Sequence, residues 1–175
     1  MKKIITVFGS SFPRPGDEEY NTAYELGKLL GQNNFDVCSG GFQGIMDAVS
    51  KGVTEAGGRA IGVTVNLYNA KPSLYLSEEI RCESLFERIE KLINTGDGYV
   101  ILPGGTGTLV ELSVVWEYIN KKMMSKKPVV CIGEYWNPII ETIENRMKLE
   151  GRETGLVKIF NGIAEAVEFI KESLN

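Results

Sequence analysis

Residues 35–65 read FDVCSGGFQGIMDAVSKGVTEAGGRAIGVTV, and two kinds of periodicity alternate within them. Short β-rich apolar runs at 35–38 and 60–65 flank a segment at 44–56 whose apolar residues recur with helical spacing. A glycine-rich turn separates the first run from the helical segment. A strand, a turn, a helix and a second strand in this order are typical of a parallel sheet with helices packed on it.

The same alternation continues on both sides of this unit. Further strands are predicted at residues 4–8, 99–102, 129–132 and, more weakly, 156–160. Further helices are predicted at residues 18–30, 84–94, 108–123, 138–149 and 164–173. We therefore predict an α/β three-layer sandwich in which a mostly parallel sheet is flanked by helices on both faces. The length of 175 residues fits one domain, so residues 1–175 are expected to form a single unit.

The segment 66–79 is the most irregular part of the chain and leaves two interpretations open. It contains Asn69, Pro72 and Ser73, together with two tyrosines that are expected to be exposed, Tyr68 and Tyr75. Such a segment can be a lid over a site or a plain connecting loop.

The charge balance excludes some classes of partner. The chain has 19 basic and 23 acidic residues and a formal net charge of −4, so it lacks the positive field that nucleic acid or an anionic membrane requires. The N-terminal apolar run is too short for a signal sequence or a membrane span. We expect neither nucleic acid nor membrane as a partner. A small anionic ligand is compatible with this charge, because backbone N–H groups can bind it.

The side chains available for chemistry are limited because the sequence contains no histidine. This excludes Ser-His-Asp triads, Cys-His pairs and histidine metal sites, so we expect no metal, and carboxylates must carry any acid–base work. The three cysteines, Cys38, Cys82 and Cys131, adjoin apolar runs and never form a CxxC pair. They are predicted to be buried reduced thiols, which is typical of a cytoplasmic protein.

Three turns after predicted strands are rich in glycine and serine, at residues 9–11, 39–44 and 103–108. In open α/β sheets such turns converge beyond the carboxyl ends of the strands, where ligands bind. A helix that begins after such a turn directs unpaired N–H groups at an anion, which predicts a phosphate site. Tight packing of helix on strand would also require glycine. Neither GxxxxGK[ST] nor GxGxxG is present, so ATP hydrolysis and NAD-linked chemistry lack their usual support and no cofactor is expected.

Glu111 falls beside the apolar face of a predicted helix. Val114, Val115 and Tyr118 follow it by three, four and seven positions, which places the carboxylate in an apolar patch. Unpaired burial of a carboxylate is costly, so Glu111 belongs either to a site or to the first turn of a helix whose dipole stabilises it.

Arg88 is expected at the rim of an apolar helix face. The buried residues predicted for that helix are Leu85, Phe86, Ile89, Leu92 and Ile93. A rim arginine either reaches over a cleft to bind phosphate or carboxylate, or covers apolar surface with its stem. On the helix at 44–56, Met46 is expected in the core, and its first-turn position leaves contact with a ligand open.

Residues 103–111, PGGTGTLVE, fit the PGGxGTxxE signature of the LOG family of cytokinin riboside 5′-monophosphate phosphoribohydrolases. Residues 39–63, SGGFQGIMDAVSKGVTEAGGRAIGV, are similar to the GGxxGxM segment of that family and the strand after it. Arg88 falls where the family places its active-site arginine. The chain therefore resembles the LOG family over most of its length.

The resemblance implies a Rossmann-like nucleotide-binding domain and a homodimer with the site near the subunit interface. It also implies hydrolysis of the N-glycosidic bond of a purine or cytokinin-type nucleoside 5′-monophosphate to free base and ribose 5-phosphate. Carried over by position, Glu111 is the catalytic carboxylate and Arg88 helps to position the ribose phosphate. With the first turn included, the implied substrate-binding and phosphate-binding residues are Gly9, Ser10, Gly40, Gly41, Gly44, Met46, Gly104, Gly105, Thr106, Gly107 and Thr108.

Three departures from the family pattern leave a second function open. Ile89 instead of lysine follows Arg88, Val110 instead of glutamate precedes Glu111, and the histidine that is common in the family is absent. Molybdenum cofactor carrier proteins have similar sequences and keep the glycine-rich turns, but they bind an anionic cofactor without cleaving it. The alternative is therefore a non-catalytic carrier of a phosphate-bearing cofactor.

Overall fold

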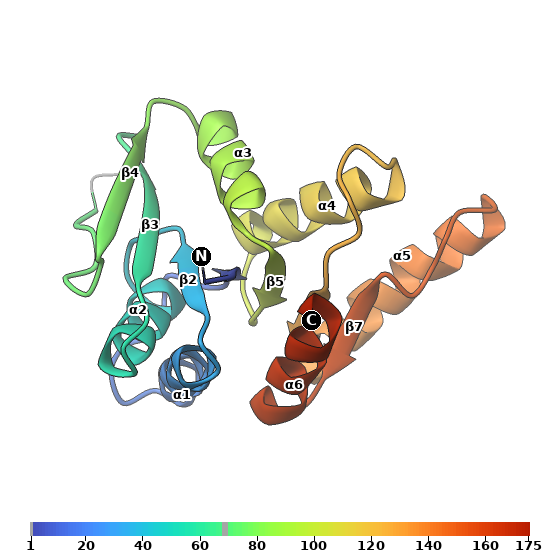
Figure 1. Cartoon of the computed structure of the whole chain (residues 1–175). Helices are drawn as coiled ribbons and strands as arrows, with labels where there is room; N and C mark the ends of the chain where they lie inside the picture. Colours follow the sequence, from blue (N-terminus) through green and yellow to red (C-terminus); the bar gives the residue numbers. More distant parts are fainter. Residues whose placement is uncertain (1, 68–69) are drawn as a thin grey trace.

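The computed structural model describes residues 2–67 and 70–175, and within them seven strands form one sheet (Figure 1). All neighbouring strands are parallel, and their spatial order is β4-β3-β2-β1-β5-β6-β7. The strands are β1 (Ile4–Phe8), β2 (Asp36–Ser39), β3 (Ala60–Val65), β4 (Glu78–Cys82), β5 (Gly98–Ile101), β6 (Val129–Ile132) and β7 (Val157–Phe160). This arrangement is a Rossmann-like α/β fold, which confirms the predicted fold class.

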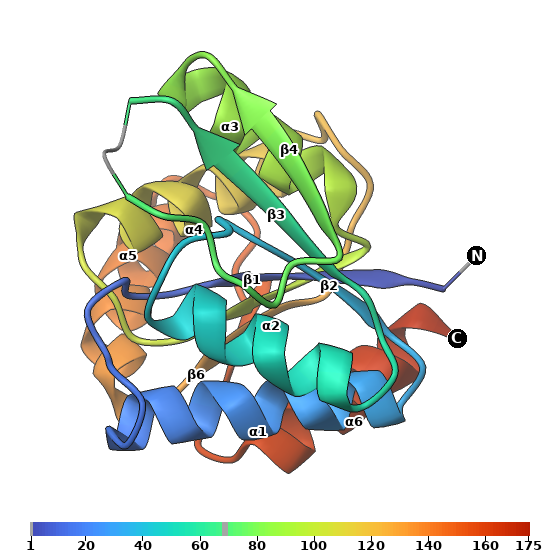
Figure 2. The same ribbon diagram turned by 90° about the vertical axis from the view of Figure 1, so that its left-hand side faces the viewer.

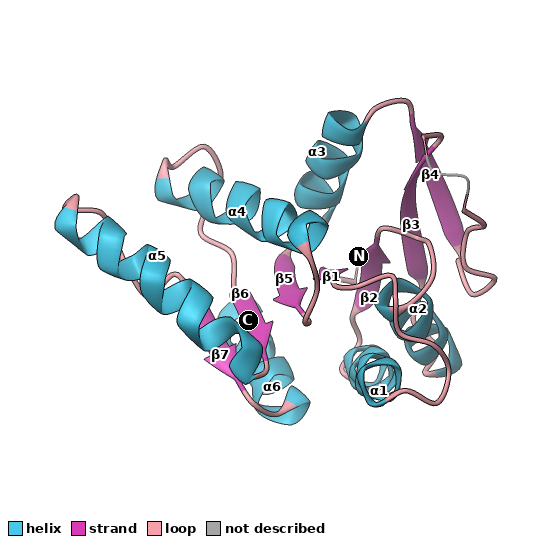
Figure 3. Cartoon of the chain, turned by 180° about the vertical axis from the view of Figure 1, so that it is seen from behind, coloured by secondary structure: helices cyan, strands magenta, loops and turns pink. Residues whose placement is uncertain are grey.

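Helices cover both faces of the sheet, with α1, α2 and α6 on one face and α3, α4 and α5 on the other (Figures 1 and 3). Their bounds are α1 (Glu18–Gln32), α2 (Ile45–Glu55), α3 (Leu85–Thr95), α4 (Thr106–Asn120), α5 (Asn137–Leu149) and α6 (Ile163–Leu174), and a short 3₁₀ turn, η1 (Glu134–Trp136), precedes α5. None of these helices is long and apolar enough to cross a membrane, judged over the described residues.

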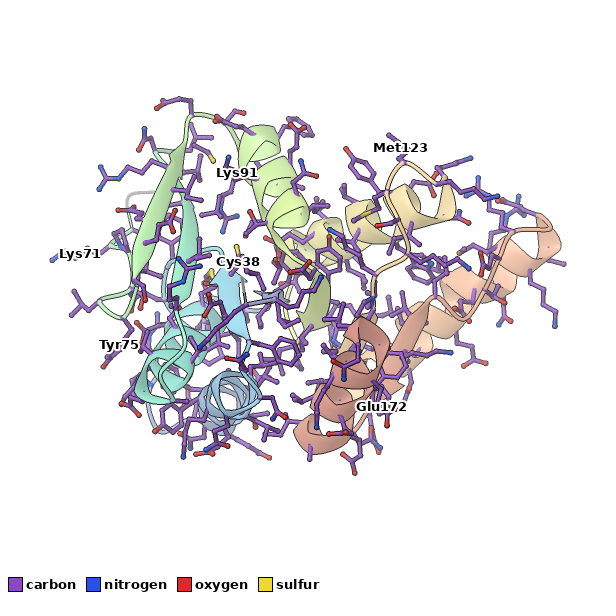
Figure 4. All side chains as sticks on the ribbon, in the orientation of Figure 1. Cys38, Lys71, Tyr75, Lys91, Met123 and Glu172 are labelled. Carbon is purple, nitrogen blue, oxygen red and sulfur yellow. The ribbon has the colours of Figure 1, made fainter. Side chains whose placement is uncertain are left out.

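Two apolar cores lie on opposite faces of the sheet because side chains alternate along each strand. In β1, Ile5 and Val7 pack with α1 and α2, whereas Phe8 packs with α3 and α4. Burying each large aliphatic side chain contributes about 1.5 to 3 kcal/mol, so this double core is the main source of stability. Cys38, Cys82 and Cys131 are free and buried, as predicted, and Figure 4 shows Cys38 inside the fold.

Strand β4 is the element that the sequence prediction missed: its first two residues fall in the segment 66–79, which was expected to be irregular, and no element was predicted for residues 80–82. β4 is an edge strand with mostly exposed residues, and its sequence EEIRC contains no apolar run. Only backbone pairing to β3 identifies it, with Val63 opposite Ile80. The predicted exposure of Tyr75 is confirmed, whereas Tyr68 and Asn69 lie outside the described residues.

The strand order reverses direction around β1, which lies between β2 and β5. Because all the strands are parallel, the turns after β1, β2 and β5 emerge at one end of the sheet, and Figure 2 shows those after β1 and β2 on the side away from both termini. Two hydrogen bonds join the glycine-rich turns there: Ser10 N–H donates to Pro103 O at 3.1 Å, and Ile45 N–H donates to Ser10 O at 2.9 Å. Ligands of open α/β sheets bind at such a point.

Candidate active site

A cavity of about 580 Å³ lies at this end of the sheet, between the turns after β1, β2 and β5. Its lining residues are Val7, Phe8, Gly9, Ser10, Ser11, Gly40, Phe42, Met46, Ala70, Arg88, Gly105, Thr106, Gly107, Thr108 and Glu111. This volume is within the usual range for a small-molecule site. The cavity thus gathers most of the predicted site residues from segments that are far apart in the sequence.

Three predicted site residues, Gly41, Gly44 and Gly104, are not among the lining residues. Gly41 and Gly44 have φ angles of 75° and 70°, a backbone region that favours glycine, and they shape the turn into α2. Gly104 packs against the Thr108 side chain, where a Cβ would approach Oγ1 to 2.2 Å. These glycines therefore position the lining residues and do not face the cavity themselves.

Helix α4 begins at the cavity with Thr106, after Gly105 as its N-cap. The amides of Thr106, Gly107 and Thr108 precede the first helical hydrogen bond, which Leu109 N–H donates to Gly105 O at 3.0 Å. A Cβ added at Gly105 or Gly107 would meet nothing within 4 Å, so both glycines border open space. Free amides and the positive end of the helix dipole make this wall suitable for an anion.

Arg88 enters the cavity from α3 and is anchored by backbone carbonyls. Its Nε donates to Val63 O at 2.8 Å, and its Nη2 donates to Gly40 O at 3.3 Å. Its guanidinium also lies over the Phe42 ring, 5.8 Å from the centroid. Arg88 is only 6% exposed, so the prediction that it lies at the rim of its helix is wrong. The carbonyl partners lie on β3 and in the turn after β2, and they compensate the burial of the charge.

The burial predicted for two neighbours of Arg88 is also wrong. Phe86 is 83% exposed and Leu85 is 39% exposed, whereas Ile89, Leu92 and Ile93 are buried as predicted. The first turn of α3 thus leaves Leu85 and Phe86 exposed, while Arg88 is among the buried residues of the helix. Arg88 therefore takes the inward position nearest the cavity.

Glu111 faces Arg88 from α4, with its Oε1 3.7 Å from Arg88 Nη1. The Glu111 side chain is 13% exposed. Burial raises the pKa of its carboxyl from 4.5 to about 7, and the charge of Arg88 opposes this rise. A carboxyl group with this pKa exchanges protons near neutral pH, which is the property that a general acid or base needs.

The sequence prediction missed five lining residues. Ser11 and Phe42 lie within turns that the sequence had singled out, so their position beside the glycines could have indicated them. Val7 and Phe8 end β1, and Ala70 comes from the irregular segment, where no sequence pattern marks it. Met46 is 8% exposed and lines the cavity, so it belongs to both the core and the site.

No group of three or more Cys, Asp or Glu residues is placed to hold a metal ion, over the part of the chain that the structure describes. The polar groups of the cavity are instead backbone amides, hydroxyls, one guanidinium and one carboxyl. This set suits an anionic organic ligand, because the amides and the guanidinium can bind an anion. The carboxylate can stabilise positive charge that develops on the ligand when a bond breaks.

The sequence model of the SLOG cluster4 family matches residues 2–157. The chain belongs to the SLOG cluster4 family. Curated relatives of this SLOG cluster4 protein are named cytokinin riboside 5′-monophosphate phosphoribohydrolases, which confirms the resemblance seen in the sequence. One from Rhodococcoides fascians is 26% identical over 151 residues, covering 82% of this chain and 75% of the relative. Another, from Oryza sativa subsp. japonica, is 31% identical over 153 residues, covering 82% of this chain and 61% of the relative.

A solved structure also resembles this SLOG cluster4 chain closely. The molybdenum cofactor carrier protein from Chlamydomonas reinhardtii superposes with a TM-score of 0.77 and 25% identity, covering 99% of each chain. The fold is thus shared with a protein named as a molybdenum cofactor carrier, whereas the curated sequence relatives are named as hydrolases.

Proposed function

We propose that this SLOG cluster4 protein hydrolyses the N-glycosidic bond of a purine or cytokinin-type nucleoside 5′-monophosphate, giving the free base and ribose 5-phosphate. The observation that carries the proposal is the pairing of Glu111 with Arg88 in a cavity that is also lined by the start of α4, the helix that carries Glu111. The names of the curated relatives support the same reaction.

The 5′-phosphate binds at the start of α4 in this proposal. The amides of Thr106, Gly107 and Thr108 donate to its oxygens, and the missing side chains of Gly105 and Gly107 leave room for it. Arg88 is the only lysine or arginine among the described lining residues, so most of the phosphate binding comes from the backbone. This explains how a chain with a net charge of −4 can bind an anion.

Glu111 acts on the sugar. Breaking the C1′–N bond develops positive charge on the ribose ring, and a carboxylate in a buried cavity stabilises that charge. The same carboxylate accepts a proton from the water that adds to C1′, while the departing base takes up a proton. The charge of Arg88, 3.7 Å from Glu111, favours the ionised form of this carboxylate. Glycoside hydrolases use carboxylates in a related step, which is an analogy.

The apolar part of the cavity accommodates the base. Phe42, Met46 and Ala70 are apolar lining residues that come from outside α4. An aromatic ring and a thioether provide the polarisable contacts that a planar heterocycle prefers.

The test is release of free base from a panel of nucleoside monophosphates that includes AMP. We expect wild-type protein to release base and Glu111→Ala to lose about 10²- to 10⁴-fold in rate, which is the usual contribution of a general acid–base group. Circular dichroism checks that the variant folds. Wild-type rates in Glu111→Ala would refute the role of Glu111.

The second candidate is a non-catalytic carrier of a phosphate-bearing cofactor. Ile89 and Val110, in place of the lysine and second glutamate of the LOG pattern, favour it, and so does the similarity to the Chlamydomonas carrier protein. Tight binding of AMP or another phosphate ligand, with no base released from any monophosphate, would support the carrier and exclude the hydrolase.

We also propose a homodimer with the site near the subunit interface. Phe86 on α3 is 83% exposed and Val110 on α4 is 45% exposed, and Val110 directly precedes Glu111. Covering these side chains with a second copy would remove apolar surface from water. Light scattering at micromolar concentration tests this, and a monomer would refute it.

A further inference from the structure

Two tyrosine–carboxylate pairs of similar geometry join α1 to α2. Tyr20 Oη donates to Asp47 Oδ2 at 2.6 Å, and Tyr24 Oη donates to Glu55 Oε2 at 2.6 Å. The helices approach closely between these pairs, because a Cβ at Gly52 would lie 2.1 Å from Tyr24 O. The two pairs thus make the same kind of link between the same two helices.

Only the first pair extends to the segment that runs from Ala70 to Ser77, called the 70–77 segment below. Ser73 Oγ donates to the second oxygen of Asp47, Oδ1, at 2.7 Å. Glu55 makes no hydrogen bond to this segment within the described residues. Ser73 is 5% exposed although most of its neighbours in the segment are exposed, so it is the buried anchor of the segment.

Ser73 connects Asp47 to the wall of the cavity. Its N–H donates to Gly41 O at 2.9 Å, and its Oγ accepts a hydrogen bond from Tyr75 N–H at 3.2 Å. Gly41 follows Gly40, whose carbonyl accepts Nη2 of Arg88 at 3.3 Å. The bonds therefore lead from Asp47 through Ser73 and the Gly40–Gly41 peptide to the arginine of the site.

Two further contacts hold the 70–77 segment in place. Gln43 Nε2 donates to Lys71 O at 3.1 Å, next to the cavity-lining Ala70. Lys51, one helical turn after Asp47, places Nζ 5.7 Å from the centre of the Tyr75 ring. Figure 4 shows Tyr75 beside α2, which agrees with this contact.

We propose that Asp47 is a positioning residue for substrate binding, because its two carboxylate oxygens hold the 70–77 segment against α2 and fix the Gly40–Gly41 turn beside Arg88. This inference rests on the proposed hydrolysis for its kinetic consequence. Asp47 is not a lining residue of the cavity, so it acts through Ser73 and Gly41.

The effect of Asp47 falls on KM more than on kcat. The shorter bond of Arg88, from Nε to Val63 O at 2.8 Å, does not depend on the 70–77 segment. Arg88 therefore stays beside Glu111 when the segment loosens, and the chemical step is retained. The wall at Ala70 and the Gly40–Gly41 turn lose their fixed positions, and substrate binding weakens.

The experiment compares Asp47→Ala with Glu55→Ala, which removes the matched pair on the same two helices. For AMP hydrolysis we expect Asp47→Ala to raise KM about tenfold with kcat within about threefold of wild type, and Glu55→Ala to leave both within about twofold. Ser73→Ala removes only the link to the segment and should raise KM in the same way. Asp47→Asn can still pair with both hydroxyls and should restore most of the loss.

Hydrogen exchange provides a readout that does not need turnover. The Ser73 amide should exchange at least about tenfold faster in Asp47→Ala than in wild type or Glu55→Ala, since it loses its fixed acceptor at Gly41. Equal KM changes in Asp47→Ala and Glu55→Ala, or an unchanged KM in Ser73→Ala, would overturn the proposal. If wild type releases no base, the proposed hydrolase function is refuted. The positioning role of Asp47 is then tested by the dissociation constant for AMP, which should rise about tenfold in Asp47→Ala and not in Glu55→Ala.

Discussion

Arg88 and Glu111 approach each other to 3.7 Å, Nη1 to Oε1, across one wall of the cavity. This separation is longer than a hydrogen bond. The two groups therefore attract each other by charge without a direct hydrogen bond between these atoms. Arg88 is held in place by hydrogen bonds to Val63 O and Gly40 O, whereas the Glu111 carboxylate can adjust its position.

The first prediction concerns the pH dependence of base release. Because the pKa of Glu111 is about 7, its ionised fraction rises from about a tenth at pH 6 to about nine-tenths at pH 8. The proposed mechanism uses the ionised form, so kcat/KM for AMP should rise through this range. Initial rates at several pH values measure it. A flat profile from pH 6 to 8 would contradict the assignment of Glu111.

The second prediction concerns stability. The folded protein holds the Glu111 proton more tightly than the unfolded chain, so between about pH 4.5 and 7 the free energy of unfolding should fall as pH rises. Glu111→Gln stays neutral and should be more stable than wild type by about 1 to 3 kcal/mol at pH 8, with the difference lost near pH 4.5. Urea unfolding at both pH values measures this. A less stable variant at pH 8 would show that ionised Glu111 stabilises the fold.

The third prediction concerns Gly40. A Cβ at this position would lie 1.9 Å from Arg88 Nη2, so Gly40→Ala must displace the guanidinium. We expect kcat/KM to fall at least about tenfold, because a displacement of about 1 Å is costly in an active site. In an Arg88→Ala background the same change should have little further effect. An additive loss in the double variant would mean that Gly40 acts independently of Arg88.

The fourth prediction separates stability from binding at Gly107. A Cβ there meets nothing within 4 Å, and alanine favours a helix over glycine by up to about 1 kcal/mol. Gly107→Ala should therefore unfold at the same or a higher temperature, while its methyl group reduces the space for phosphate and raises KM. Ser113→Ala, on the exposed side of α4, is the control and should leave KM unchanged. Unchanged KM in Gly107→Ala would place the phosphate elsewhere.

Much of the fold could be predicted because the buried strands of a parallel sheet are rich in apolar residues. All four residues of β2, β5 and β6 are buried, and apolar residues marked each of these strands in the sequence, although β2 (DVCS) also buries Asp36 and Ser39. Strand β4 was missed for the opposite reason: most of its residues are exposed, with Cys82 buried, and its pairing to β3 through the backbone leaves no apolar run in the sequence.

Residues that line the cavity could be predicted where the local sequence determines their geometry. They could not be predicted where their geometry depends on contacts with residues that are distant in the sequence. Residues of all three glycine-rich turns line the cavity, and these turns were identified from the sequence. The burial of Arg88 could not be predicted, because the carbonyls that satisfy it come from Val63 and Gly40. The network of Asp47, Ser73 and Tyr20 is likewise assembled from three separate segments.

The contact between Gly40 and Arg88 also constrains how this chain can evolve. Residue 40 has to lack a side chain chiefly because the arginine occupies the space that a Cβ would fill. A lineage that lost the arginine could accept a larger residue at position 40 once the Met46 thioether, 2.7 Å from a Cβ there, also shifted, and the arginine could not then return in a single step. Loss of the arginine would then be difficult to reverse, and related sequences that keep arginine at position 88 should also keep glycine at position 40.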